Sequence, residues 1–350
     1  MANGSTGQEM KIDSNGDSGR RISVAPMMEW TDRHCRTFHR ALSRRAWLYT
    51  EMLTAQAILH GDRSRLLGRG EEGDRVVLQL GGNDPAALAR CAAIGAEWGY
   101  QEINLNCGCP SDRVQEGAFG ACLMAEPETV AAAVRAMRDA VALPVTVKHR
   151  IGIDRIESYD FVRDFVGTVA AAGCRRFIVH ARNAWLDGLS PRENREIPPL
   201  RHDLVHRLAA DFPHCAFELN GGLQSLAHAL DVSRGLAGAM LGRVAYHQPW
   251  TLAGVDATED PGPVDAPPRD RSAVVEAMVG YLLRHRGDGK EHVEVRYLAR
   301  HMLGLYHGEP GARTWRRMLS DSAALREDDP SLLLRARDRV EAASLLPQPA

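Results

Sequence analysis

The feature that most constrains this chain is a regular alternation of short apolar runs with helical patterns, from Ile22 to about residue 255. Most runs end in glycine, asparagine or a charged residue, as buried parallel strands do before a turn. The expected strands cover 22–24, 47–49, 76–80, the start of 102–111, 145–148, 177–180, 216–219 and 238–241. Eight such units predict an α/β fold, a closed (β/α)8 TIM barrel. An open doubly wound sheet is the alternative, but no G-x-G-x-x-G motif follows the first strand.

The segments between and after these runs predict helices and a second domain. In the barrel the expected helices cover 32–42, 55–67, 84–98, 128–141, 158–172, 200–210 and 225–232. Residues 256–270 contain four prolines and several acids, which is typical of a linker. Helical patterns at 272–285, 291–305, 313–319 and 330–346 then predict a small domain of four helices. The expected organisation is a disordered tail at 1–20, the barrel at 21–255, the linker, and a helical domain at 271–350.

Composition narrows the class of protein. The net charge is −2, with 44% hydrophobic and 25% charged residues, as in an ordinary globular protein. This balance gives no overall attraction to nucleic acid or membrane, although a local basic face is enough to bind RNA. Seven scattered cysteines without Cys-x-x-Cys spacing predict reduced thiols in a cytoplasmic protein and no structural metal site. No apolar window is long enough to cross a membrane.

The strand ends carry the candidate chemistry, because activity in such a barrel lies where strands end and the following loops begin. Glycines after strands seven and eight let backbone amides approach phosphate oxygens, and Arg243 adds a charged donor. Lys148 and His180 suit an anionic or polarisable ring, and Gln79 suits its polar edge. A tight turn or a solvated strand end explains each element alone, but their convergence predicts a binding site. The elements are Pro26-Met27-Met28, Gln79, Asn104/Asn106/Cys109, Lys148, His180, Asn220-Gly221-Gly222 and Gly242-Arg243.

Several segments closely resemble the tRNA-dihydrouridine synthases, in order and over roughly residues 20 to 320. These are Val24–Arg33 (VAPMMEWTDR), Leu78–Gly82 (LQLGG), Asn104–Ser111 (NLNCGCPS) and Asn220–Gly222 (NGG). The segments His180–Leu186 (HARNAWL), Leu189–Leu200 (LSPRENREIPPL) and Gly311–Arg317 (GARTWRR) are similar, more narrowly, to the A branch of that family. The resemblance implies a flavin mononucleotide (FMN) barrel with a helical tRNA-binding domain.

In such enzymes NADPH reduces the flavin, which passes hydride to C6 of a uracil in the tRNA D-loop while a cysteine protonates C5. The resemblance makes Cys109 the proton donor, and a neutral thiol suits that role. It implies U20 and U20a as the substrates. The FMN-binding residues it implies are Pro26, Met27, Met28, Gln79, Lys148, His180, Asn220, Gly221, Gly222, Gly242 and Arg243. The tRNA-binding residues are Asn106, which would touch both flavin and uridine, and Arg113, Arg192, Arg195, Arg313, Arg316 and Arg317.

Alternatives remain open at this stage. The chain could be an FMN barrel that acts on a small molecule such as a free pyrimidine, or a non-catalytic RNA-binding barrel. Cys107 is a second thiol two residues before Cys109, on the same face of an ideal strand. Because the strand ends there, we expect Cys109 alone to reach the substrate. His149 is expected to face away from Lys148, and the protein to be a monomer.

Overall fold

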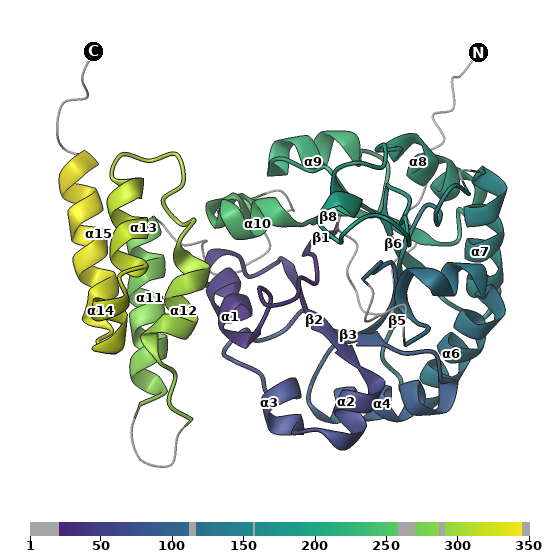
Figure 1. Ribbon diagram of the computed structural model, residues 1–350, viewed down its shortest axis with the longest axis horizontal. Coiled ribbons are helices and arrows are strands. Elements are labelled where there is room, and N and C mark those ends of the chain that lie inside the picture. The colour runs from purple at the N-terminus through teal and green to yellow at the C-terminus, as the bar shows by residue number, and fades with distance from the viewer. Residues whose placement is uncertain (1–20, 112–116, 157, 258–269, 287–290, 345–350) are drawn as a thin grey trace, which may run out of the picture.

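A closed parallel barrel forms the larger part of the molecule. The computed structural model describes residues 21–111, 117–156, 158–257, 270–286 and 291–344. Each strand pairs in parallel with the next, and β8 pairs with β1 (Figure 1). The predicted TIM barrel is therefore confirmed. The strands are β1 (Arg21–Val24), β2 (Trp47–Thr54), β3 (Val76–Gly81), β4 (Glu102–Cys107), β5 (Val145–Arg150), β6 (Arg176–His180), β7 (Ala216–Asn220) and β8 (Gly238–Leu241).

Helices surround the barrel. The predicted single helix over 55–67 is wrong, because Gly61 ends one helix and the Asp62 side chain accepts from the Arg65 amide to start another. The helices are α1 (Arg33–Leu42), α2 (Ala55–His60), α3 (Arg63–Leu67), α4 (Pro85–Glu97), α6 (Pro127–Ala140), α7 (Tyr159–Ala171), α8 (His202–Asp211), α9 (Leu226–Val232) and α10 (Arg243–His247). The 3-10 turns are η1 (Gly120–Ala125), η2 (Glu193–Arg195) and η3 (Pro249–Ala257).

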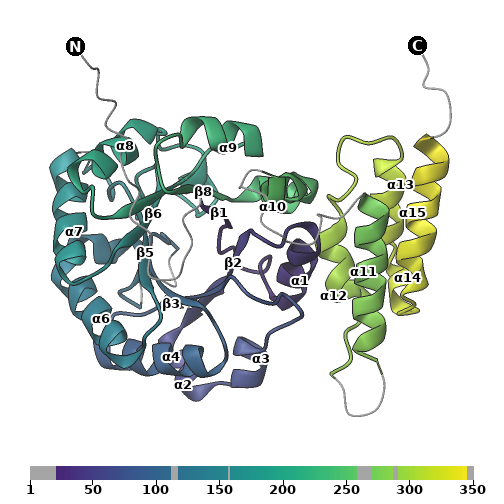
Figure 2. The same ribbon diagram turned by 180° about the vertical axis from the view of Figure 1, so that it is seen from behind.

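The helices after residue 270 form a separate group beside the barrel, next to α1 and α10 (Figures 1 and 2). They are α11 (Arg271–Arg284), α12 (Val295–Met302), α13 (Ala312–Leu319), α14 (Ser322–Arg326) and α15 (Ser331–Ser344). The described part has five helices here, not the predicted four, because the Asp321 carboxylate caps the amides of Ala323 and Ala324 and starts α14. No helix in the described ranges is long and apolar enough to span a membrane.

Some predictions fall outside the described residues. They are the disordered tail at 1–20, most of the linker at 256–270, and the proposed tRNA contact Arg113. The exact division into domains therefore stays a prediction.

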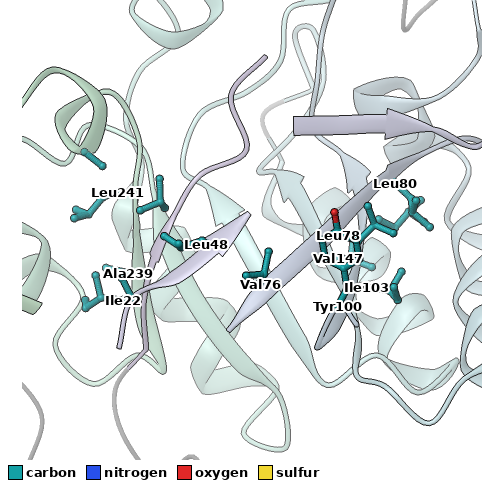
Figure 3. Packing of buried hydrophobic residues seen from close by; sticks show 14 of the residues in the cluster. Ile22, Leu48, Val76, Leu78, Leu80, Tyr100, Ile103, Val147, Ala239 and Leu241 are labelled. Carbon is teal, nitrogen blue, oxygen red and sulfur yellow. The ribbon is translucent and has the colours of Figure 1, made fainter. Parts of the chain in front are cut away.

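Side-chain alternation along the strands decides which residues face the helices and which face the barrel interior. Outward residues such as Ile22, Val76 and Leu241 pack into the core between the sheet and the helices, as Figure 3 shows. Inward residues form a small second cluster that includes Tyr49, Val77 and Met240. Because neighbouring residues of a strand face opposite sides, the alternation decides which side chains can reach the mouth.

A buried charge network fills the floor of the barrel. Arg21 of β1 forms ion pairs with Glu102 of β4 at 2.7 Å and Glu218 of β7 at 3.3 Å. Glu218 also pairs with Arg176 at 3.1 Å and accepts from the Ser23 hydroxyl at 2.9 Å. Strands far apart in the sequence are thus joined below the site.

Candidate active site

A chain of carboxamides connects the barrel interior to Cys109. Gln79 Nε2 donates to Asn104 Oδ1 at 2.7 Å, and Asn106 Nδ2 donates to Gln79 Oε1 at 2.8 Å. Asn106 Oδ1 then accepts from the amides of Gly108 at 3.0 Å and Cys109 at 2.9 Å. Asn106 therefore holds the turn that carries the thiol. Direct contact of Gln79 with a flavin, or of Asn106 with flavin or uridine, stays a prediction.

The two thiols at the end of β4 lie in different environments. Cys109 is partly exposed beyond the strand, with Sγ 3.4 Å from the Ser111 hydroxyl, and its carbonyl accepts from the Ala121 amide at 2.9 Å. Cys107 is fully buried in the outer core that also contains Ile103. Burial raises the pKa of the Cys107 thiol well above its ordinary value, and Cys174 and Cys122 add to the shift. Of these two thiols, Cys109 is the one at the mouth.

Lys148 and His180, the two predicted ring-binding groups, lie at the same rim. Lys148 is paired in register with Asn106, and burial, followed by the charge of Arg150, lowers the pKa of its ammonium to about 7. Burial and then the charges of Arg150 and Lys148 hold the pKa of His180 well below its ordinary value. Within the described residues the Lys148 ammonium has no hydrogen-bond partner. An anionic group beside it would stabilise the charged form of the ammonium and raise its pKa again.

His149 lies on the opposite side of β5. It packs against Phe165 of α7 and Phe177 of β6, with ring centroids 5.2 and 5.8 Å away. Its Nδ1 lies 2.6 Å from the Arg150 carbonyl oxygen. The expectation that it faces away from Lys148 is confirmed.

The glycine elements after β7 and β8 leave space at the rim. Gly221 has φ +107°, and a Cβ there would come within 2.5 Å of the His180 ring. Beside them, Asn220 Nδ2 donates to the Met240 carbonyl at 2.7 Å. A Cβ on Gly242 would meet nothing within 4 Å. Arg243, the next residue, is exposed and forms an ion pair with Glu196 at 2.6 Å. The open space at Gly242 and the neighbouring guanidinium of Arg243 suit a phosphate group.

The loop after β1 supplies an apolar edge of the mouth. Pro26 and Met27 are half-buried and Met28 is 58% exposed. The loop closes on itself, since the amides of Trp30 and Thr31 both donate to the Met27 carbonyl. Methionine side chains adapt their shape to a flat ligand.

Arg150 is a residue of the site that sequence reasoning missed. It is 3% exposed and, among the described residues, forms no ion pair with a carboxylate. Its guanidinium instead donates to the carbonyls of Gly108 at 3.1 Å, Asn183 at 3.1 Å and Asn194 at 2.8 Å. It joins the Cys109 turn to the long loop after β6. Arg150 follows Lys148 by two residues on β5, so strand alternation could have predicted that both side chains face the barrel interior.

The predicted tRNA-binding arginines lie in two places. Arg192 and Arg195 are exposed on the loop after β6, whose Asn194 is buried and bonds to Trp185 and Leu189. Three further arginines share the exposed face of α13, opposite the buried Trp315 and Leu319. They are Arg313, Arg316 and Arg317. No described residue forms an ion pair with these three side chains.

Comparison with known proteins gives a consistent family match. The family model described as "Dihydrouridine synthase (Dus)" matches residues 23–341. A Salmonella typhi protein named tRNA-dihydrouridine(20/20a) synthase is 52% identical over 90% of this chain and 94% of its own length. Proteins of the same name from Synechocystis sp. and Escherichia coli K12 are 53% and 55% identical, over 89% and 87% of this chain and 92% and 86% of their own.

Solved structures support the fold. A 2-naphthoyl-CoA reductase complex aligns with TM-score 0.53 and 10% identity, over 68% of this chain and 50% of its own. A histamine dehydrogenase from Rhizobium sp. 4-9 aligns with TM-score 0.51 and 13% identity, over 68% and 46%. At this identity the likeness shows the barrel architecture alone.

Proposed function

This chain belongs to the dihydrouridine synthase family, and we propose that it reduces uridine to 5,6-dihydrouridine in the D-loop of tRNA. The relatives named tRNA-dihydrouridine(20/20a) synthase make U20 and U20a the expected substrates. The observation that carries the proposal is the position of Cys109. Asn106 holds it at the rim of the barrel, beside the cationic side chains of Lys148 and Arg150.

The residues at the rim fit FMN as the flavin. The ammonium of Lys148 lacks an anionic partner among the described residues, which suits the electron-rich edge of a reduced ring. The open space at Gly242 and the guanidinium of Arg243 suit the phosphate. Met27 and Met28 would cover one edge of the ring. His180, Asn220, Gly221 and Gly222 complete the proposed set, with Gln79 supporting it from below.

Cys109 is the proposed proton donor. A bound, reduced flavin would supply hydride to C6 of the uracil. The negative charge that then develops over C5 and O4 requires a proton at C5, which the Cys109 thiol gives as its S–H bond breaks and a C5–H bond forms. The thiolate left on Cys109 takes a proton from solvent before the next turnover. NADPH is the proposed reductant.

Substrate RNA would be held by arginines around this mouth. A base stacked in a folded loop must be extruded to reach Cys109, at a cost of a few kcal/mol. Phosphate contacts of Arg192 and Arg195 near the site and of the α13 arginines on the helical domain would offset that cost. Arg113 and Asn106 belong to the same proposal. We further propose that the protein acts in the cytoplasm as a monomer.

The test is the dihydrouridine content of tRNA incubated with the protein and NADPH, mapped by position. We expect product at positions 20 and 20a. Cys109→Ala should nearly abolish product while NADPH still reduces the flavin, and Cys107→Ala should retain activity because its side chain is in the outer core. Product from Cys109→Ala, or its loss only in Cys107→Ala, would contradict the proton-donor assignment. Reduction of free uridine without need of tRNA would favour a small-molecule oxidoreductase instead.

A further inference from the structure

The loop between β1 and α1 has a conformation that needs outside support. Glu29 has φ +65°, the left-handed region that residues with a Cβ adopt only at a cost in energy. Within the loop, Thr31 Oγ1 accepts from the Met27 amide at 3.0 Å and donates to the Met27 carbonyl at 3.2 Å. These bonds close the turn, and the Glu29 amide donates to the Glu51 carboxylate of β2. Neither contact involves the Glu29 carbonyl, so we expect a further element to hold that carbonyl.

That contact comes from α12 of the helical domain, about 270 residues later in the chain. An Arg300 guanidinium nitrogen donates to the Glu29 carbonyl at 3.0 Å and to Asp32 Oδ2 at 2.6 Å. The other carboxylate oxygen of Asp32 caps α1 through the amides of His34 and Cys35. Arg300 thus hydrogen-bonds both to the Glu29 peptide of the loop and to the residue that caps the following helix, α1.

His301, the next residue, extends these contacts to α10, which follows the neighbouring strand β8. It is 1% exposed, and its Nε2 lies 3.1 Å from Asp32 Oδ2. Its Nδ1 lies 3.1 Å from the hydroxyl of Tyr246 on α10. The Tyr246 ring stacks on Trp30 of the β1 loop, with centroids 4.3 Å apart and planes 11° from parallel. Tyr246 lies one turn after Arg243 on the same helix, and Arg243 belongs to the proposed phosphate site.

We propose that Arg300 and His301 are positioning residues of the cofactor site, and that the helical domain is a structural part of that site as well as an RNA-binding unit. The inference rests on the proposed binding of FMN. Through Asp32 and Glu29, the pair fixes the loop that presents Met27 and Met28. Through Tyr246, it fixes the helix that begins at Arg243. Loosening α12 would therefore weaken FMN binding without removing any group that touches FMN.

The experiment is FMN titration of flavin-free full-length protein, followed by quenching of flavin fluorescence. We expect Arg300→Met to raise the Kd for FMN roughly five- to tenfold, because the loop then samples conformations that cannot bind. Arg300→Lys keeps one charged contact to Asp32, so its Kd for FMN should lie between those of the unaltered protein and Arg300→Met. The matched control is Arg296→Met on the same helix. Among the residues that the structure describes, Arg296 pairs with Glu294 and Tyr297 of its own segment and with no residue of the barrel. The FMN affinity of Arg296→Met should therefore stay within twofold of the unaltered protein.

The outcomes separate this inference from the proposed function. If the unaltered protein binds no FMN, both are overturned. If it binds FMN but Arg300→Met binds equally well, only the role of α12 is overturned. An equal loss in Arg296→Met would also overturn it, because the effect would then reflect the helix in general. If Arg300→Met fails to fold, Tyr246→Phe, which removes only the hydroxyl facing His301, carries the same test. Its Kd for FMN should rise about three- to fivefold, and an unchanged Kd would contradict the inference.

Discussion

At the scale of single residues, the charge of Lys148 should respond to what binds in the mouth. Its pKa is lowered from 10.5 to about 7 by burial and then by Arg150. Between these two values the unfolded chain holds a proton on this side chain that the ligand-free folded protein releases. The contribution of Lys148 to stability therefore rises with pH through that window. Binding of an anion raises the pKa again, so binding is coupled to proton uptake above about pH 7.

The first prediction follows from that coupling. The affinity for FMN should fall as pH rises above 7, by up to about tenfold per pH unit if one proton is taken up. Measurement of FMN affinity between pH 6.5 and 8.5 tests it. Lys148→Met should bind more weakly and show a flatter profile. Riboflavin, which has the ring without the phosphate, shows which part of FMN meets the ammonium. An equally steep profile in Lys148→Met would contradict the assignment.

Arg150 gives a second prediction at this scale. Arg150→Met removes the donor that joins the Cys109 turn to the loop after β6. Because a displacement of about 1 Å can lower a rate a hundredfold, we expect uridine reduction to slow by about ten- to a hundredfold. Flavin reduction by NADPH should change by less than about twofold, since it does not use Cys109. Rapid-mixing measurement of the two half-reactions distinguishes them.

If Arg150 had a purely structural role, the outcome would differ. Arg150→Met would then slow both half-reactions together and lower the unfolding temperature in proportion. Arg150→Lys, which keeps a donor but not the fork, should recover part of the uridine reduction rate alone. The matched control is Arg163→Met, whose side chain is exposed on α7 and pairs with Asp160 and Asp164.

Some of these residue positions could be predicted and others could not. All strands of a parallel barrel end at one rim, so a list of strand ends already placed Lys148 and His180 near Cys109. Alternation along β5 likewise placed His149 outside. The inward position of Arg150 could have been predicted from its spacing after Lys148, but its contacts could not, because they are made to three carbonyls in irregular loop conformations. For the same reason nothing in the sequence indicated that Asn194 would organise the loop after β6.

At the scale of elements, errors occurred where side-chain caps or irregular pairing override local pattern. β2 was expected to end at Tyr49 but continues to Thr54, because a register shift between Tyr49 and Met52 lets it keep pairing with β3. Asp62 starts a second short helix within the stretch expected as one helix, and Asp321 starts a short helix that propensity alone did not indicate. By contrast, β8 is bounded as expected at both ends.

Helix α13 gives the prediction that belongs to this scale. Its Arg313, Arg316 and Arg317 are exposed and, within the described residues, form no ion pair, so they are available for phosphates. Replacing all three with alanine should weaken tRNA binding and lower the slope of log affinity against log salt by up to about 3. Binding measured at several salt concentrations tests this. FMN affinity should not change, and Arg163→Ala should leave the slope intact. An unaltered slope in the triple variant would show that α13 faces away from the RNA.

At the scale of the whole molecule, the barrel and the helical group are not independent. A test that deletes everything after residue 270 would separate a tRNA enzyme from a small-molecule enzyme only if the barrel kept its cofactor site. The contacts of Arg300 with Glu29 and Asp32 make that assumption unsafe. Point substitutions on α13 are the better probe, since they remove charge from the surface and leave the interface in place.

The last prediction concerns the closure of the barrel itself. Glu218 is fully buried and contacts Arg21, Arg176 and the Ser23 hydroxyl, so it joins β1, β6 and β7 through ion pairs and a hydrogen bond. Glu218→Gln would remove the anion that Arg21 and Arg176 share, while Arg21 keeps its ion pair with Glu102. Loss of one partner from a buried ion pair costs about 3–5 kcal/mol. The exposed pair of Asp160 with Arg163 is the control, and Asp160→Asn should cost no more than about 1 kcal/mol. Denaturant unfolding of both variants measures the difference. Because the network lies below the mouth, Glu218→Gln should keep its FMN affinity at temperatures where it is folded; similar losses of stability in the two variants would show that the floor does not close the barrel.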